Sequence, residues 1–357
     1  MTTFSLCMIV KNESAVLKRC LISIADIMDE IIIVDTGSTD NTKEIAAEFT
    51  DKIYDYTWID DFAAARNFAF SKANMDYIYS ADADEVLDEL NRQRLMQLKE
   101  LILPEIEIVQ MHYITPPEYN TTANFIREYR PKLYRRLRTF TWVDAVHETV
   151  RLEPVIYNSD IEIQHLPQNM HSSRDFGIFQ SVFAKEGKLS DKLHSMYAKE
   201  LFISGTDEDF KQAEEVFASM LYHPEATDEM QREAICVLSH IKRITGLTDE
   251  FFSLAFKLMP DALCAEISYE IGCYFMEKED YMEAVSWFET AVEHTSAIID
   301  IRRSGKLPLE ALSQCHCLIA EKIKEENPQD EYFYQTYMET AREYADRALI
   351  WKAPQNI

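Results

Sequence analysis

The sequence predicts an α/β domain with a mainly parallel sheet over residues 1–180, followed by an all-α domain over residues 181–357. Three observations support this prediction. The chain has 357 residues, which is too long for one ordinary domain. In the first half, apolar runs of strand length alternate with amphipathic helical segments, and strand signals end near residue 179. Glycine is scarce, with 7 residues in the chain, so few tight turns are available and helices are favoured.

Strands and helices alternate along the first domain. The predicted elements are a strand at 4–10, a helix at 13–25, a strand at 30–34, a short helix to about residue 49, a strand at 52–56, a helix at 61–73 and a strand at 77–80. This β-α-β order predicts a parallel sheet with helices on both faces. Such sheets bind ligands at the carboxyl ends of their strands.

A carboxylate stands at the predicted end of each of these strands, at Glu13, Asp35, Asp61 and Asp82 in turn. After the fourth strand, Asp82 and Asp84 are one residue apart. One interpretation is an acidic turn that caps the next helix. The other is a D-x-D site for Mg²⁺ or Mn²⁺ beside a diphosphate, because these ions prefer oxygen ligands. The sequence contains neither G-x-G-x-x-G nor the P-loop motif, which argues against a dinucleotide oxidoreductase or a P-loop enzyme.

Four segments, in order, resemble the motif series of glycosyltransferase family 2, which has the Rossmann-like GT-A fold. They are Ser5–Glu13, Asp29–Asp40, Trp58–Asn67 and Asp82–Glu85. The chain is most similar to the subgroup that joins this domain to tetratricopeptide-like helices, as the sublancin-type S-glycosyltransferases do. The resemblance implies an inverting transfer of a sugar from a nucleotide diphosphate donor, a UDP-sugar, with Mn²⁺ or Mg²⁺ as cofactor.

The resemblance also implies roles for individual residues at the donor. It places Val10 and Glu13 around the nucleoside and Asp35 near the base or ribose. The alternatives are a core position for Val10 and a first-turn helix acid for Glu13. Further predicted donor contacts are Asp61, Arg66, Asn67 and Asp82, and the predicted metal ligands are Asp82 and Asp84. These predictions rest on the resemblance, on the D-x-D spacing or on side-chain chemistry. For Arg66 the alternative is a solvated helix residue, although its guanidinium group suits a diphosphate or a buried aspartate.

Six basic residues crowd into residues 127–138, where Glu128 is the one acid. They are Arg127, Arg130, Lys132, Arg135, Arg136 and Arg138. In a chain with a net charge of -26, this cluster predicts a local anion, so Arg130 and Arg135 are predicted to bind the diphosphate. The alternative is an edge strand whose charges prevent pairing with another chain.

The segment Trp142–Glu148 is similar to the closing segment of the subgroup, in which a G-x-V-H-E element follows an arginine-rich strand. Here Asp144 replaces the glycine. An inverting transfer needs a base near the acceptor nucleophile, and Glu148 is predicted to be that base. His147 is an alternative base, a substrate contact or a structural histidine. His165 ends another predicted strand and is predicted as a third metal ligand, although a histidine on a strand is often structural.

The second domain contains a helical repeat pattern. Residues 265–294 match one tetratricopeptide repeat, and weaker copies cover 197–221 and 334–351. The packing positions of the first repeat are Gly272, Phe275, Tyr281, Ala284, Phe288 and Ala291. Such repeats must stack to bury their apolar faces. They would present an acceptor, form a homodimer surface, or only stabilise the catalytic domain.

Charge and cysteine content limit the partners and the cellular location that we expect for the protein. The 62 acids against 36 bases repel phosphate backbones, so no nucleic acid partner is expected. No apolar stretch reaches the ~18 residues of a membrane helix, and the apolar start of the chain is predicted to be a strand rather than a signal peptide. Seven cysteines without a C-x-x-C pair indicate a reduced, cytoplasmic protein.

Function remains open among several classes at this stage. The preferred hypothesis is a metal-dependent inverting glycosyltransferase, for which a Ser, Thr or Cys side chain of a peptide or protein is one possible acceptor. An acceptor saccharide of surface polysaccharide synthesis is the alternative within that class. A tetratricopeptide scaffold that has lost catalysis and a nucleotidyltransferase are the others. The nucleotidyltransferase is disfavoured because the glycine-rich basic loop expected after the first strand is missing.

Overall fold

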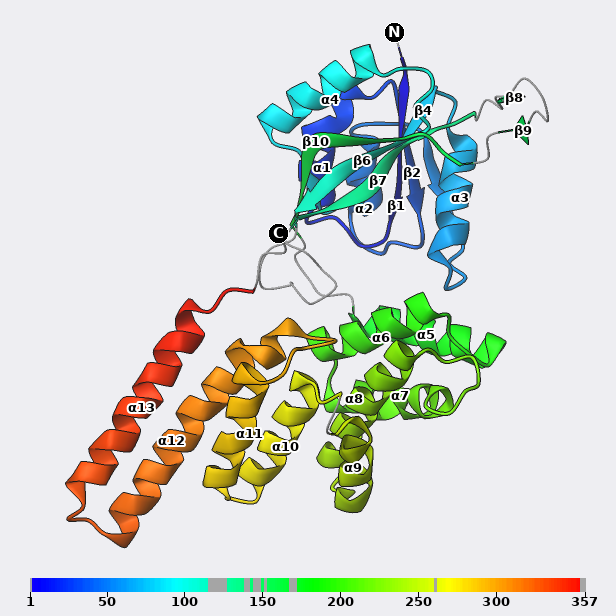
Figure 1. The fold of residues 1–357 in the computed structure, drawn as a ribbon. Helices are drawn as coiled ribbons and strands as arrows, with labels where there is room; N and C mark the ends of the chain where they lie inside the picture. Colours follow the sequence, from blue (N-terminus) through cyan, green and yellow to red (C-terminus); the bar gives the residue numbers. More distant parts are fainter. Residues whose placement is uncertain are drawn as a thin grey trace. The chain divides into compact units, whose positions relative to one another are not determined.

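The computed structural model describes residues 2–114, 127–137, 142–143, 149–150, 153–166, 172–259 and 262–353 (Figure 1). The chain forms two compact units, and the division between them falls near residue 170. Every described strand precedes that division and helices alone follow it. The predicted α/β class with a following all-α region is therefore confirmed.

An eight-stranded mixed sheet forms the centre of the first unit, in the order β3-β2-β1-β4-β7-β6-β10-β5. Its strands are β1 (Phe4–Val10), β2 (Glu30–Asp35), β3 (Ile53–Asp55), β4 (Tyr77–Ser80), β5 (Glu85–Val86), β6 (Ile108–Ile114), β7 (Arg127–Arg135) and β10 (Ile156–His165). The first four strands are mutually parallel, as predicted. Strand β7 is antiparallel to both of its neighbours, and β5 is antiparallel to β10. A separate pair joins β8 (Trp142–Val143) and β9 (Thr149–Val150).

Helices cover both faces of the sheet, as predicted. They are α1 (Leu17–Ile24), continued by η1 (Ala25–Ile27), α2 (Thr42–Ala47), α3 (Phe62–Lys72) and α4 (Glu89–Leu101). Alternate residues of β1 point to opposite faces. Leu6 and Met8 pack in one cluster with residues of α1, α2 and α4, whereas Cys7 packs with Ala69 of α3 on the other face. Figure 1 shows α3 across the sheet from α1 and α4.

A buried acid, Glu30, joins three segments at the amino ends of the parallel strands. Its carboxylate accepts hydrogen bonds from Ser5 Oγ at 2.5 Å, Lys52 Nζ at 2.6 Å and the Asn74 backbone N–H at 2.8 Å. Burial raises the pKa of Glu30, but the hydrogen bonds from Asn74, Lys52 and Ser5 outweigh it and lower the pKa from 4.5 to about 2. This carboxylate therefore stabilises the folded state while it is ionised.

The pH dependence of stability follows from that shift. Because the folded pKa lies below the unfolded value, the stabilisation is present above the unfolded pKa and is lost as the pH falls through the range from 4.5 to about 2. We expect Glu30→Gln to lower the free energy of unfolding by about 3 kcal/mol at neutral pH. Urea denaturation at neutral and acidic pH measures this effect. Equal loss of stability on acidification in both proteins would contradict the assignment.

The second unit consists of helices packed as successive neighbours. They are α5 (Ser172–Glu186), α6 (Asp191–Ser204), α7 (Asp207–Met220), α8 (Asp228–Ile244), α9 (Thr248–Ala255), η3 (Phe256–Leu258), α10 (Ala265–Glu277), α11 (Tyr281–Glu293), η4 (Ile301–Ser304), α12 (Lys306–Glu326) and α13 (Glu331–Ile350). Figure 1 shows α10 beside α11 and α12 beside α13. The helices from α5 to α10 share one apolar core, and residues of α11, α12 and α13 form another.

The predicted helical hairpin at residues 265–294 is confirmed as α10 and α11. Ala284, Phe288 and Ala291 of α11 are fully buried. Gly272 of α10 lies against the Phe288 ring, and a Cβ atom added at Gly272 would come within 2.6 Å of it. The small residue is therefore required by the close approach of the two helices.

A larger side chain at this contact should destabilise the second unit. We expect Gly272→Leu to lower the free energy of unfolding by about 2 kcal/mol or more, because Phe288 must shift. Gly177 in α5 is the matched control, since a Cβ atom added there meets nothing within 4 Å. We expect Gly177→Leu to be neutral or to gain up to ~1 kcal/mol from helix propensity. Thermal melting compares the two, and equal melting temperatures would refute the close packing at Gly272.

A buried ionic network joins three elements of the second unit around Glu270 on α10. His240 Nδ1 of α8 lies 2.9 Å from its carboxylate, and Arg243 Nε of α8 donates to it at 2.6 Å. Arg303 of η4 donates to the same carboxylate and stacks on the Phe202 ring. Burial raises the pKa of Glu270, but His240, Arg243 and Arg303 outweigh it and hold the pKa well below its ordinary value.

Two further properties of the described residues bear on the sequence predictions. No helix among them combines the length and the apolar character needed to cross a membrane. All seven cysteines are free thiols, and five of them are buried. Two of these, Cys236 and Cys264, lie close to Glu266, whose carboxylate already accepts backbone hydrogen bonds from residues 298–300.

Candidate active site

Two predicted donor residues meet where β1 and β2 end. Val10 and Asp35 are register partners on the parallel strands, and both are buried, with 3% and 1% of their surface exposed. The Val10 carbonyl accepts a hydrogen bond from the Thr36 backbone N–H at 2.9 Å. Because both strands end here, the chain leaves the sheet in two adjacent loops at its carboxyl edge.

Asp35 retains an acceptor atom at this edge. Its Oδ2 accepts hydrogen bonds from the backbone N–H groups of Gly37 at 3.1 Å and Ser38 at 3.0 Å. Gly37 has a φ of 103°, a conformation that glycine adopts without strain. Asp35 Oδ1 is buried and finds no hydrogen-bond partner among the residues that the structure describes. A buried acceptor of this kind is suited to a donor group of a ligand.

Hydrogen bonds join the loop after β1 to the loop after β2. The Asn12 backbone N–H donates to Ser38 Oγ at 2.9 Å, and Asn12 Oδ1 accepts from the Thr39 N–H at 2.8 Å. The Glu13 backbone N–H donates to Thr42 Oγ1 at 2.7 Å. Asn12 has a φ of 56°, in the left-handed region that asparagine tolerates better than most residues. The two loops therefore form one rigid edge beside Val10 and Asp35.

Each acid of the turn Asp82-Ala83-Asp84-Glu85 contacts a base from a different element. The turn begins two residues after β4 and is closed by a hydrogen bond from the Glu85 N–H to the Asp82 carbonyl at 3.2 Å. The pairs are Arg66 Nη2 of α3 with Asp82 Oδ1 at 2.7 Å, His165 Nε2 of β10 with Asp84 Oδ2 at 3.0 Å, and Lys132 Nζ of β7 with Glu85 Oε1.

The pKa values of two of these acids shift in opposite directions. Burial raises the pKa of Asp82, but the positive charges of Lys132 and Arg66 outweigh it and lower the pKa. For Glu85, burial dominates over Lys132 and raises the pKa from 4.5 to about 7. Asp82 is thus held ionised at neutral pH.

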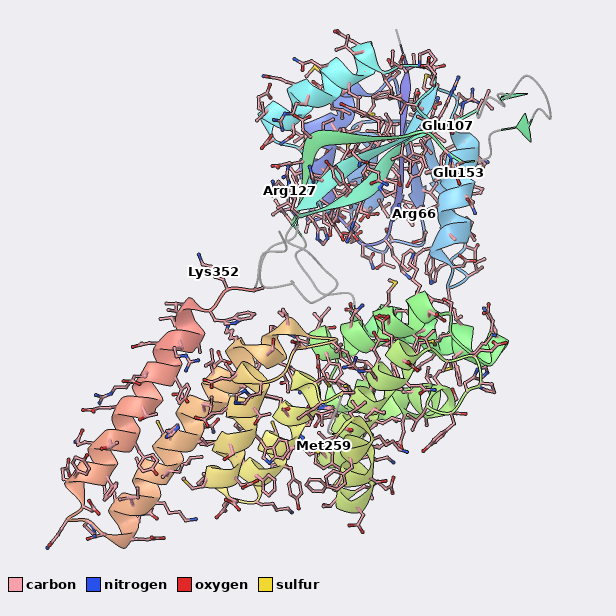
Figure 2. The ribbon with its side chains drawn as sticks, viewed as in Figure 1. Arg66, Glu107, Arg127, Glu153, Met259 and Lys352 are labelled. Carbon is pink, nitrogen blue, oxygen red and sulfur yellow. The ribbon has the colours of Figure 1, made fainter. Side chains whose placement is uncertain are left out.

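A cavity of about 440 Å³ opens beside Asp82, between α3, β4 and β7. Its wall includes Arg66, which reaches from α3 towards the sheet (Figure 2) and also donates to Ser80 Oγ at 3.0 Å. Arg130 and Lys132 line the opposite side, on β7. Three bases therefore surround this cavity, which suits it to an anion.

The basic residues of β7 separate between the two ends of the sheet. Arg130 lies at the site, with its guanidinium group 3.9 Å from the Tyr113 ring centroid and 2.5 Å from Glu128. Arg135 lies at the other end, where its backbone N–H donates to the Glu107 carbonyl at 2.8 Å and its side chain to the Pro104 carbonyl. Figure 2 shows Glu107 and Arg127 at opposite ends of the β6–β7 pair.

Two interpretations of residues 127–138 are corrected by this arrangement. The strand is not an edge strand, because β7 lies between β4 and β6. Arg135 does not lie beside Asp82, because five residues of an extended strand separate it from Arg130, a distance of about 17 Å. The predicted cluster of diphosphate ligands therefore retains Arg130 at the site and loses Arg135.

Parts of the chain are similar to known proteins. Residues 5–150 match the family described as Glycosyl transferase family 2. These residues form a glycosyltransferase family 2 domain. The family 2 domain contains the loops at Val10 and Asp35, the acidic turn and the whole of β7.

Two curated relatives match parts of the chain. A TPR repeat-containing protein of Synechococcus elongatus is 51% identical over 87 residues, which are 24% of this chain and 22% of that protein. The SPbeta prophage-derived glycosyltransferase SunS of Bacillus subtilis is 32% identical over 158 residues, which are 43% of this chain and 35% of SunS. The chain thus spans about a fifth to a third of the length of these relatives.

A solved structure of glucosyl-3-phosphoglycerate synthase from Mycobacterium tuberculosis is also similar to the chain. It is 15% identical, with a TM-score of 0.38, and the match covers 53% of this chain and 82% of that one.

The remaining predicted residues of the first unit fall into three groups. Asp61 is exposed and caps α3 by accepting a hydrogen bond from the Ala64 N–H at 2.9 Å, and Asn67 lies on α3 at the cavity wall. His147 and Glu148 lie outside the residues that the structure describes, so their roles stay predictions. Asp84 and His165 are brought into contact, and Asp82 is turned towards Arg66.

Several residues of the site were not singled out by sequence reasoning. Asn12, Ser38 and Thr42 join the loops after β1 and β2 through hydrogen bonds that no spacing rule predicts. Glu85 and Lys132 were noted as parts of a motif and of a basic cluster, but not as partners. The polar residues flanking the ends of β1 and β2 were the available signal, since side-chain caps are typical of loops that bind ligands.

The conformation of Asn12 gives a test of the rigidity of the loop after β1. Both Asn12→Gly and Asn12→Ala remove the hydrogen bond to Thr39, but only glycine tolerates a φ of 56° at no cost. We expect Asn12→Ala to be less stable than Asn12→Gly by about 1 kcal/mol. Urea denaturation of the two variants measures the difference, and an alanine variant as stable as the glycine variant would show that the loop relaxes.

Proposed function

We propose that this chain is a metal-dependent, inverting glycosyltransferase that transfers a sugar from a UDP-sugar donor to an acceptor. The observation that carries the proposal is the acidic turn Asp82–Glu85, which lies at the carboxyl end of the parallel strand β4 beside a cavity lined by basic residues. A nucleoside diphosphate needs an acceptor for its nucleoside, cations for its phosphates and oxygen ligands for its metal. The buried acceptor of Asp35, the bases around the cavity and the acids of the turn support these three requirements in turn.

The nucleoside would lie against the loops after β1 and β2. Asp35 Oδ1 is a buried acceptor without a partner among the described residues, and a ribose hydroxyl or base N–H would supply its missing hydrogen bond. Val10 provides an apolar wall beside it, and Glu13 begins the segment that Thr42 anchors. The hydrogen bonds at Asn12 would hold this surface in place before the donor binds.

The diphosphate would be bound by the basic cavity. Arg66 and Arg130 approach it from α3 and β7, and a guanidinium fork matches phosphate oxygens in geometry. These charges are fixed in advance, because Arg66 is held by Asp82 and Ser80, and Arg130 by Glu128 and Tyr113. Preorganised charges of this kind stabilise a leaving diphosphate more than mobile ones do.

The side chains around the acidic turn fit a divalent cation. Asp82 and Asp84 offer carboxylate oxygens, and His165 offers an imidazole whose Nδ1 has no hydrogen-bond partner in the described part of the chain. The two carboxylates suit Mn²⁺ or Mg²⁺, which prefer oxygen ligands. Among the described residues, Asp82, Asp84 and His165 do not form a preassembled group of three ligand atoms, so the side chains would have to close around the ion. A bound ion would neutralise charge on the departing diphosphate. Lys132 and Arg66 meanwhile lower the pKa of Asp82, and a metal ligand must be ionised.

Inversion requires a base on the acceptor side, and Glu148 is proposed for it, with His147 as the neighbouring candidate. The acceptor is proposed to be a peptide or protein side chain, which the helical unit would help to bind. The support for a polypeptide acceptor is the stacked hairpin α10–α11 and its neighbours, a surface typical of peptide-binding repeats.

Removal of one proposed metal ligand tests the reaction. We expect Asp84→Ala to reduce nucleotide release from a UDP-sugar with Mn²⁺ by ~100-fold, because the cation loses a carboxylate. Asp160→Asn is the control, since Asp160 is exposed on the same strand as His165 and pairs with Arg94. Nucleotide release is measured over a panel of UDP-sugars. No release by the wild-type protein from any donor, or equal release by Asp84→Ala, would refute the transferase.

Mass spectrometry of proteins co-expressed with the enzyme tests the acceptor. We expect a Ser, Thr or Cys side chain to gain one hexose in the presence of the wild-type protein and not with Asp84→Ala. An active enzyme that modifies no polypeptide but extends a saccharide would replace the peptide acceptor with a saccharide one.

A further inference from the structure

Lys132 and Glu85 form a buried ion pair directly behind the acidic turn. Their side chains are 7% and 3% exposed, and Lys132 Nζ donates to Glu85 Oε1. In the order of the sheet, β6 and β10 stand between their strands β7 and β5. The pair therefore connects two segments that share no backbone hydrogen bonds, from residues 47 positions apart.

Glu85 is placed to control the shape of the turn. Its backbone N–H closes the turn onto the Asp82 carbonyl, and it pairs in register with His165, the residue that contacts Asp84. At the other end, the Ala81 N–H donates to the Cys7 carbonyl of β1 at 3.3 Å. A shift of Glu85 would thus move both Asp82 and the contact between Asp84 and His165.

The position of Lys132 argues against direct contact with the donor. Although Lys132 contributes to the cavity wall, it is nearly inaccessible and its ammonium group is bound to Glu85. For stability alone, two apolar side chains would serve as well as a buried ion pair, which must recover the cost of desolvating both charges. A buried ion pair adds a defined geometry, because either buried charge without its partner is strongly unfavourable.

We propose that Lys132 and Glu85 are positioning residues, whose ion pair fixes the Asp82–Asp84 turn in the geometry that receives the metal and the diphosphate. The inference rests on the proposed function, since it concerns the same site. It assigns Lys132 no contact with the reacting atoms. Outer residues that orient metal ligands typically contribute about 10- to 100-fold to metal affinity or activity.

Three variants separate positioning from direct binding of the donor. In Lys132→Met and Glu85→Gln we expect the Mn²⁺ concentration for half-maximal nucleotide release to rise by ~10-fold or more. In Lys132→Arg, which retains the charge, we expect a rise of less than about 3-fold. Glu85→Gln is decisive, because it leaves the Lys132 charge in place. A lysine that binds the diphosphate directly would keep its effect in that variant, and an unchanged Mn²⁺ requirement would overturn the proposal.

Lys99→Met is the matched control. Lys99, on α4, is also a largely buried lysine in an ion pair, and its Nζ lies 2.6 Å from Asp29 Oδ2. We expect it to lose stability without a change in the Mn²⁺ requirement. A folded Lys132→Met with the wild-type Mn²⁺ requirement, or a Lys99→Met with the same rise as Lys132→Met, would overturn the proposal.

Hydrogen exchange gives a readout that does not depend on activity. We expect the amides of residues 81–87 to exchange at least ~10-fold faster in Glu85→Gln and Lys132→Met than in the wild-type protein, and at the wild-type rate in Lys99→Met. If the wild-type protein releases no nucleotide, the proposed function fails, and exchange at residues 81–87 alone decides whether the pair positions the turn. Unchanged exchange there in folded variants would overturn the positioning role.

Discussion

The candidate site depends on one constraint: basic side chains must neutralise three acidic side chains that lie within four residues. Asp82, Asp84 and Glu85 would repel one another at the end of a buried strand, so each must meet a base from elsewhere in the fold. The bases come from α3, β10 and β7, which are elements far apart in the sequence. The tertiary fold is therefore what makes this turn possible, and the turn in return ties the helix layer, the sheet and its final strand together.

The antiparallel insertion of β7 decides how charge is distributed over the first unit. Because the strand runs against β4, its beginning lies at the carboxyl edge and its end at the amino edge. One run of basic residues thus supplies the site with Arg130 and Lys132, while Arg135 and Arg136 bond to backbone carbonyls of the opposite edge. The acids of β2 are divided between the two edges in the same way. Glu30 stabilises the fold at the amino edge, whereas Asp35, one strand length away, faces the site at the carboxyl edge.

The sequence was informative where the signal is local. Periodicity located the parallel strands, and the polar residues after them indicated the edge at which Val10, Asp35 and Asp82 lie. The partners of β7 could not be predicted, because alternation shows that a segment is a strand but not which strands it pairs with. The contact of Lys132 with Glu85 was missed for a related reason, since it requires a strand and a turn 47 residues apart to meet. Glu148 and His147 remain predictions from resemblance, outside the described residues.

The ionic network around Glu270 bears on how the helical unit loses its structure. In an ideal array of repeats each hairpin contacts only its neighbours, and the ends can melt independently. Here α8, α10 and η4 share one buried carboxylate, so opening any of them leaves an uncompensated charge in the interior. Helices α8 to α11 should consequently unfold together as a single cooperative block, whereas α13, which packs mainly against α12 outside this network, should be the first to fray.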